Sequence, residues 1–134
     1  MKTQAIQQAV NLAQTLQHVF VATSDAGGLP HLAAASRIEV VEDAKVAISE
    51  WFCPGTMENL EQNRRIALVI WDAAADKGYQ LLGEVEDMNR EAMMNGYAPE
   101  LASREPLPQV EWRITVRVDK VLDFSHAPHS DVEE

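Results

Sequence analysis

Residues 50–60 have the sequence Glu-Trp-Phe-Cys-Pro-Gly-Thr-Met-Glu-Asn-Leu, which predicts a strand that turns into a short helix at a Pro-Gly corner. Thr56 stands where the helix N-cap is expected, and Asn59 is expected to face back toward that cap. Because amides at a helix N-terminus attract anions, the corner is a candidate phosphate site. The alternative is that Pro, Gly and Thr serve only the turn and the cap.

Outward from this corner, short apolar runs alternate with turn residues. Apolar residues at helical spacing predict a buried stripe on a helix over residues 3–17. The helix after the corner is expected over 56–63 and to end in a left-handed turn at Asn63. Residues 89–105 are expected to be helical in places. Six strands are predicted, over residues 18–24, 31–41, 45–49, 65–71, 79–87 and 112–119.

Hairpins link most of these strands, beginning with the turn at Asp25-Ala-Gly-Gly28. The run 65–71 is almost continuously apolar and is expected to be buried on both faces. Strands and helices do not alternate as in a parallel sheet, so a closed or partly closed antiparallel barrel is expected. Residues 1–134 are taken as one domain, with an N-terminal helix in 1–17 and a flexible acidic tail at 125–134.

The charge balance bears on the partners of the chain. Eleven basic and 21 acidic residues give a net charge of −10, which argues against binding nucleic acid or an anionic membrane over a broad surface. The single cysteine, Cys53, excludes an intramolecular disulfide and is expected to be a packed, unreactive thiol. Neither a signal peptide nor an apolar membrane-spanning run is found, so a cytoplasmic location is expected.

Several side chains are candidates to contact a ligand. The small run Ala33-Ala-Ala-Ser36 would let a flat molecule approach the backbone, or it could pack under a helix. Arg37 could bind a phosphate through its guanidinium group, or it could be an ordinary surface residue. Trp51 and Trp112 could flank an aromatic ligand, whereas Trp71 is expected in the core. His126 and His129 do not form a convincing metal site, and spacing alone nominates no catalytic acid or base.

The order of parts carries a resemblance. His18-Val-Phe-Val-Ala-Thr23, Leu29-Pro-His-Leu32, Thr56-Met-Glu-Asn-Leu60 and Asn63-Arg-Arg-Ile-Ala-Leu-Val69 together resemble the pyridoxamine 5′-phosphate oxidase-like family of FMN-binding split barrels, especially its small single-domain members. The resemblance implies a mainly β fold, a six-stranded antiparallel split β-barrel (Greek key) with short flanking helices. It also implies a homodimer with FMN at the subunit interface.

The resemblance implies roles for particular residues. The second strand would place Ala34, Ala35 and Ser36 along the flavin. Gly55, Thr56 and Asn59 would line the phosphate end. Many members of the family carry a basic residue directly before the threonine, where this chain has Gly55. The remaining residues expected around the cofactor are Arg37, Ser49, Glu50, Trp51, Gln80 and Trp112.

The function expected from the resemblance is that of an FMN-binding flavoprotein, an oxidoreductase or electron-transfer protein acting on a small-molecule substrate or electron donor. Authentic pyridoxamine 5′-phosphate oxidase activity is not expected, because a second phosphate would need basic residues that the sequence scarcely offers. Two alternatives stay open. One is a non-catalytic dimer that binds a flavin, a deazaflavin or haem, and the other is a split barrel that has lost its cofactor.

Overall fold

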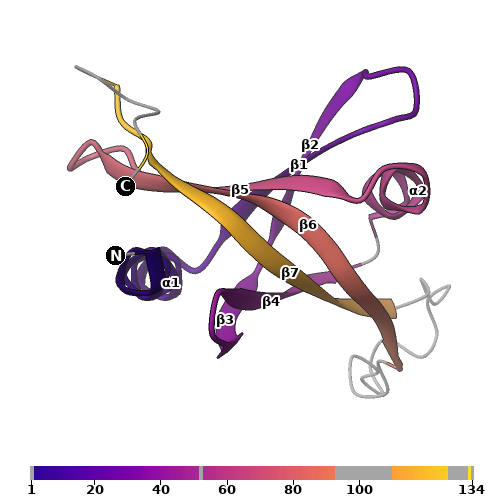
Figure 1. The fold of residues 1–134 in the computed structure, drawn as a ribbon, viewed down its shortest axis with the longest axis horizontal. Coiled ribbons are helices and arrows are strands. Elements are labelled where there is room, and N and C mark those ends of the chain that lie inside the picture. The colour runs from indigo at the N-terminus through magenta and orange to yellow at the C-terminus, as the bar shows by residue number, and fades with distance from the viewer. Residues whose placement is uncertain (1, 52, 93–109, 127–132, 134) are drawn as a thin grey trace, which may run out of the picture.

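A computed structural model of the chain describes residues 2–51, 53–92, 110–126 and 133. In these residues, seven strands form one antiparallel sheet with the order β2-β1-β5-β6-β7-β4-β3, and two helices pack against it (Figure 1). The elements in chain order are α1 (Lys2–Leu16), β1 (Val19–Ser24), β2 (Pro30–Ala35), β3 (Arg37–Glu42), β4 (Lys45–Trp51), α2 (Pro54–Gln62), β5 (Arg65–Asp72), β6 (Lys77–Ala92) and β7 (Val110–Asp123).

The strand count within the described residues is seven because the run predicted as one strand over 31–41 is two strands. A bend at Ser36 separates β2 from β3. β2 pairs with β1 and β3 pairs with β4, so these consecutive strands form the two opposite edges of the sheet. The bend therefore folds the sheet round on itself, and the mainly β antiparallel fold expected from the sequence is confirmed.

The β1–β2 hairpin has the turn that its sequence predicts. Gly28 has a φ of +90°, a conformation that glycine adopts without steric cost. One carboxylate oxygen of Asp25, Oδ1, accepts hydrogen bonds from the amides of Gly27 and Leu29 at 2.9 and 2.8 Å. An aspartate that binds the amides following it stabilises a tight turn, so this hairpin has a defined end.

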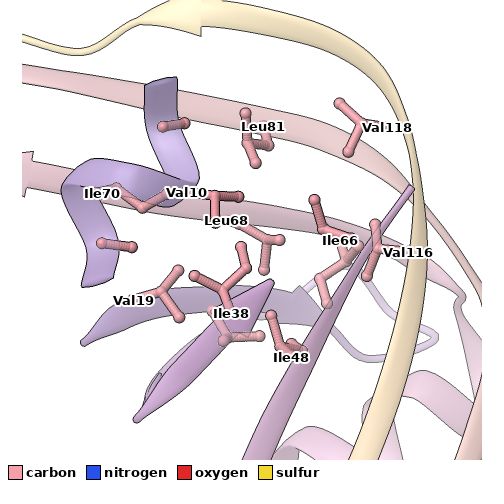
Figure 2. Packing of buried hydrophobic residues seen from close by; sticks show 14 of the residues in the cluster. Val10, Val19, Ile38, Ile48, Ile66, Leu68, Ile70, Leu81, Val116 and Val118 are labelled. Atoms are coloured by element: carbon pink, nitrogen blue, oxygen red, sulfur yellow. The ribbon is translucent and has the colours of Figure 1, made fainter. Parts of the chain in front are cut away.

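The core lies between α1 and the concave side of the sheet. α1 buries the predicted stripe, in which Ile6, Ala9, Val10 and Ala13 are all at most 2% exposed. Figure 2 shows this helix packed over aliphatic side chains from several strands. The labelled members of the cluster are Val10, Val19, Ile38, Ile48, Ile66, Leu68, Ile70, Leu81, Val116 and Val118.

Two expectations about the strands were wrong. β5 was expected to be buried on both faces, but only Ile66, Leu68 and Ile70 are buried, and the residues between them are half-buried. The outer face of this strand is therefore partly open in the isolated chain. Residues 89–92 belong to β6 and are not helical, because they pair with β7. The rest of the predicted 89–105 insertion lies outside the described residues.

β6 and β7 are long and bent, and they connect the two halves of the barrel (Figure 1). Their register shifts between Leu82 and Gly83 and again between Val85 and Asp87. At the first shift, a Cβ built on Gly83 would lie 2.0 Å from the carbonyl oxygen of Arg117. Only glycine permits so close an approach of the two backbones, and a bulge of this kind bends its strand.

The last strand follows the predicted alternation. Ile114, Val116 and Val118 are buried, and Trp112 is half-buried against the core cluster. Trp71, expected in the core, is instead half-buried, and its indole Nε1 donates a hydrogen bond to Asp76 Oδ1 at 3.1 Å. Neither helix of the described chain has the length and apolar character needed to span a membrane. The tail prediction falls largely outside the described residues.

Candidate functional site

The helix after the corner begins two residues earlier than its sequence predicts. Pro54 is its first residue and Cys53 its N-cap, so the expectation that Thr56 is the N-cap was wrong. Proline is well suited to this first position, because it has no amide that would need a partner there. The first intrahelical hydrogen bond runs from the amide of Met57 to the carbonyl of Cys53 at 3.1 Å. Helical geometry thus leaves the amides of Gly55 and Thr56 without an intrahelical acceptor.

Thr56 carries a buried hydroxyl group with no partner. The residue is 0% exposed, and its Oγ1 makes no hydrogen bond within the described part of the chain. A hydroxyl buried without a partner costs about 1–3 kcal/mol, so such atoms in native proteins call for an explanation. This hydroxyl lies in the first turn of α2, beside amides that also lack intrahelical partners.

Side-chain hydrogen bonds fix α2 against the β1–β2 hairpin. Asn59 Nδ2 donates to Thr23 Oγ1 at 3.0 Å, and Asn63 Nδ2 donates to Ser24 Oγ at 2.9 Å. The expectation that Asn59 faces its own helix cap is replaced by this contact with β1. The expected left-handed turn at Asn63 was also wrong, because its φ is −144° and the backbone there is extended. Both asparagines therefore hold the helix in place.

His31 lies against the N-terminus of α2, although no sequence pattern selected it. It pairs with Thr23 across the β1–β2 ladder, and directly opposed residues of such a pair project from the same face. A Cβ built on Gly55 would lie only 2.8 Å from His31 Nε2. The imidazole thus covers the position where any other residue at 55 would place its side chain. Recognising this contact would have required the strand register and the position of the helix together.

The small residues of β2 divide between the two faces of the sheet. Ala35 is buried at 3% exposure and Ala34 is exposed, because successive residues of a strand project to opposite sides. Ser36, at the bend, is exposed. The three residues expected along a flavin therefore cannot all present their side chains to one flat ligand. A flat ligand lying along residues 34–36 would therefore contact their backbone as well as their side chains.

A cavity of about 720 Å³ brings three predicted residues together, namely Ser36, Arg37 and Ser49. Arg37 and Ser49 are directly opposed in the β3–β4 ladder. Arg113, which the sequence did not select, also lines this cavity, and its Nη1 lies 2.8 Å from Glu39 Oε1. Residues of α1 form another wall, and among the described residues none of α2 lines the cavity. Arg37 is thus grouped with α1, apart from Gly55 and Thr56.

The remaining predicted residues lie on β4, β6 and β7. Glu50 is opposed to Trp112 in the β4–β7 ladder, and Trp51 follows it at the end of β4. Gln80 is opposed to Leu122 on β7, whereas Trp112 is opposed to Arg90 on β6. Gln80 and Trp112 are therefore about 33 Å apart along the path of β6, at about 3.3 Å per residue. One protomer does not bring them to the same ligand ring.

Gln80 shares a row with Ala34 on the outer face of the sheet. The ladders align Ala34, Phe20, Val69 and Gln80 across β2, β1, β5 and β6. The next row on the same face contains Leu32, Ala22, Ala67 and Leu82. Leu32 is 63% exposed, and all members of both rows are exposed or half-buried. The outer face is therefore largely apolar and open to solvent in the isolated chain.

Acidic and basic side chains alternate across β4, β6 and β7. Lys45 Nζ lies 2.8 Å from Glu86 Oε1 and 3.5 Å from Glu42 Oε1. The hydrogen bond to Glu86 is the main cause that raises the pKa of Lys45 above its usual value. Arg117 similarly contacts Asp119, whose hydrogen bond is the main cause that raises the pKa of Arg117. The Lys45–Glu86 pair connects β4 with β6, whereas the Arg117–Asp119 pair lies within β7.

The histidines near the C-terminus and the cysteine are the remaining candidate reactive side chains. The described residues contain no group of three or more His, Cys, Asp or Glu side chains that could hold a metal ion. His126 is exposed, and His129 lies outside the described residues. Cys53, the single cysteine of the chain, is a half-buried thiol at the start of α2. The arrangement at this helix instead favours a ligand with an anionic group.

The chain belongs to the pyridoxamine 5′-phosphate oxidase family, whose model (PNPOx_N) matches residues 3–118. Among solved structures, it is similar to the HupZ protein of Group A Streptococcus, with a TM-score of 0.63 and 19% identity over 94% of this chain and 97% of that one. It is also similar to an FMN-binding protein of Syntrophomonas wolfei, with a TM-score of 0.67 and 16% identity over 93% of this chain and 89% of that one. The similarity to an F420 reductase has a TM-score of 0.60 and 18% identity over 83% of this chain and 93% of that one.

These similarities establish the fold, an antiparallel split barrel of the pyridoxamine 5′-phosphate oxidase type. At identities of 19% or less, the structural matches carry no information on the ligand of this chain. No curated protein matches it significantly in sequence.

Proposed function

We propose that this protein is an FMN-binding flavoprotein that acts as an oxidoreductase or an electron carrier for a small molecule. The observation that carries the proposal is the buried, unpartnered hydroxyl of Thr56 in the first turn of α2. A phosphate oxygen would supply the missing partner, and membership of a family that contains oxidases supports a flavin phosphate in that role.

The residues of the chain fit the parts of FMN. The amides of Gly55 and Thr56 and the Thr56 hydroxyl would bind the phosphate, whose charge suits the positive end of the helix dipole. Ala34 and Ala35 project to opposite faces of the sheet, so their small size would let the ring system approach the backbone of β2 from either side. When bound, FMN would supply the electron-transfer chemistry, and the protein would provide position and electrostatics.

The cavity beside Arg37 supports a small polar substrate. Its volume of about 720 Å³ falls within the range of small-molecule sites. Arg37 and Arg113 supply guanidinium groups there, and buried Ser49 supplies a hydroxyl group. Guanidinium groups bind carboxylates and phosphates through paired hydrogen bonds, so we assign this cavity to a substrate with an acidic group. Authentic pyridoxamine 5′-phosphate oxidation forms no part of this proposal.

The active form in this proposal is a homodimer that associates through the outer face of the sheet. The support is the pair of apolar rows across β2, β1, β5 and β6, including Leu32 at 63% exposure. Covering such rows removes apolar surface from water, which drives most protein association. The same interface would bring Gln80 of one protomer nearer to the partner.

A spectrum and a titration test the proposal. The purified protein should bind FMN at micromolar concentration or tighter, become yellow, and be reduced by NADH or NADPH. F420 and haem should be titrated in parallel, because they represent the deazaflavin and haem alternatives. A protein that stays colourless and binds no FMN at micromolar concentration contradicts the proposal. Binding without reduction by any donor would instead indicate a non-catalytic flavin-binding protein.

A further inference from the structure

The N-terminus of α2 has no cationic side chain of its own. Its first four residues are Pro54, Gly55, Thr56 and Met57, none of which carries a charge. The whole chain has a net charge of −10, which works against binding a doubly charged phosphate. Amides and a hydroxyl alone would have to offset that repulsion. A nearby donor from another element would strengthen the site.

His31 is the side chain that the fold brings to this position. Its Nε2 is 2.8 Å from the point where a Cβ on Gly55 would lie, and its Cε1 and Cδ2 are 3.3 and 3.4 Å from that point. The ring therefore lies directly over the second residue of the helix. The hydrogen bond from Asn59 to Thr23 connects α2 to β1. Because Thr23 pairs with His31, this bond also keeps His31 of β2 next to the helix.

The imidazole is available to a ligand. His31 is exposed, and within the described residues its side chain makes no hydrogen bond or ion pair. A histidine ring donates through an N–H group in either charge state. Next to the amides of Gly55 and Thr56, such a donor would contact the same anion as they do.

We propose that His31 binds the ligand phosphate together with the first turn of α2, in the space that Gly55 leaves by having no side chain. The inference rests on the proposed function and assigns the anion donors of the site as the amides of residues 55 and 56, the Thr56 hydroxyl and the His31 imidazole. It also explains why position 55 is a glycine, because the side chain of any larger residue there would collide with the ring of His31.

The test compares FMN with riboflavin, which lacks the phosphate, by fluorescence titration of the full chain. His31→Ala should weaken FMN binding about tenfold or more and leave riboflavin binding unchanged, because a hydrogen bond to a charged group is lost. Gly55→Ala keeps the histidine but displaces its ring, so it should weaken FMN binding in the same selective way. His126→Ala, which removes an exposed histidine beyond the end of β7, is the matched control and should change neither affinity.

The outcomes separate the two proposals. Wild-type protein that binds neither flavin overturns the proposed function and this inference with it. If wild-type binds FMN but His31→Ala and Gly55→Ala bind it equally well, His31 has no phosphate role, although the flavoprotein assignment stands. Equal losses for FMN and riboflavin also overturn the inference, because they indicate contact with the ring. Circular dichroism tests whether each variant is folded. If His31→Ala is unfolded, the FMN affinity of Gly55→Ala decides whether His31 binds the phosphate.

Discussion

Asn59 Nδ2 donates a hydrogen bond to Thr23 Oγ1 across 3.0 Å, one of the contacts that hold α2 against the β1–β2 hairpin. Thr23 is only 5% exposed, so its hydroxyl has little access to water. The pair stands next to the first turn of α2, because the strand residue opposed to Thr23 is His31, whose ring lies against Gly55. The position of the proposed site therefore depends on a hydrogen bond outside it.

Asn59→Ala should lower the free energy of unfolding by about 1–2 kcal/mol, because it leaves the Thr23 hydroxyl buried without a partner. Urea denaturation provides the measurement. Thr23→Val in the same background should restore part of the loss, since both partners are then apolar at that contact. If the loss of unfolding free energy in the double variant equals the sum of the losses in the two single variants, the two side chains do not interact energetically.

Thr56→Val should act in opposite directions on stability and on binding. Replacing an unpartnered buried hydroxyl with a methyl group of similar size should raise the stability of the FMN-free protein by about 1 kcal/mol. The same change should weaken FMN binding about tenfold, because one donor to the phosphate is lost. Thermal unfolding without FMN and fluorescence titration give the two readings. Thr56→Ser keeps the hydroxyl and is the control, and a Thr56→Val protein of reduced stability would argue that the hydroxyl is satisfied.

Gly83→Ala should lower the free energy of unfolding by about 2 kcal/mol or more, since its new Cβ would lie 2.0 Å from a backbone oxygen that cannot rotate away. Gly27→Ala is the matched control, because its nearest neighbour is a side-chain oxygen at 3.5 Å and its backbone is not left-handed. Chemical denaturation of both variants tests the difference. Equal stabilities would mean that β6 and β7 can separate at the bulge without cost.

Leu32→Glu should raise the dimer dissociation constant about tenfold or more without unfolding the protomer, because it places a charge on the proposed interface at a side chain that is already 63% exposed. Sedimentation equilibrium measures the constant. Val41→Glu, at a 40% exposed position on β3, adds the same charge away from that face and should leave the dimer intact. If both substitutions change the dimer dissociation constant equally, the outer face is not the dimer interface.

Glu86→Gln should lower the pKa of Lys45, because the hydrogen bond to Glu86 is the main cause that raises it. A lysine whose pKa is higher in the folded state stabilises the fold fully below its unfolded pKa, and this contribution disappears as the pH rises through the folded value. In Glu86→Gln the contribution should therefore be smaller, so wild type and variant should differ in urea midpoint near pH 9 and converge above about pH 12. A difference that stays constant with pH would show that Lys45 does not cause it.

The sequence predicted most of the fold because apolar periodicity reports which face of a segment is buried. Of the predicted stripe, Ile6, Ala9, Val10 and Ala13 are buried and Leu16 is half-buried, and the alternation from Trp112 to Val118 is observed. Periodicity could not reveal the bend at Ser36, because the apolar pattern continues across it while the hydrogen-bonding partner changes from β1 to β4.

The candidate site was predictable only in part. The Pro-Gly-Thr corner correctly located a helix N-terminus, but capping preferences selected Thr56 and missed that Pro54 begins the helix. His31 could not be selected, because its contact with Gly55 joins residues far apart in the chain. Roles inferred from resemblance grouped Arg37 with the phosphate residues, whereas the structure places it in the cavity beside α1.

The single-residue bend at Ser36 also determines which strands lie at the edges of the sheet. It turns one chain segment into both edges of the sheet, each a strand of six residues. Pro30 lies at the end of one edge and Glu39 and Glu42 lie on the other, and both residue types discourage the addition of a foreign strand. The two edges that the bend creates therefore carry residues that work against edge-to-edge pairing with another chain.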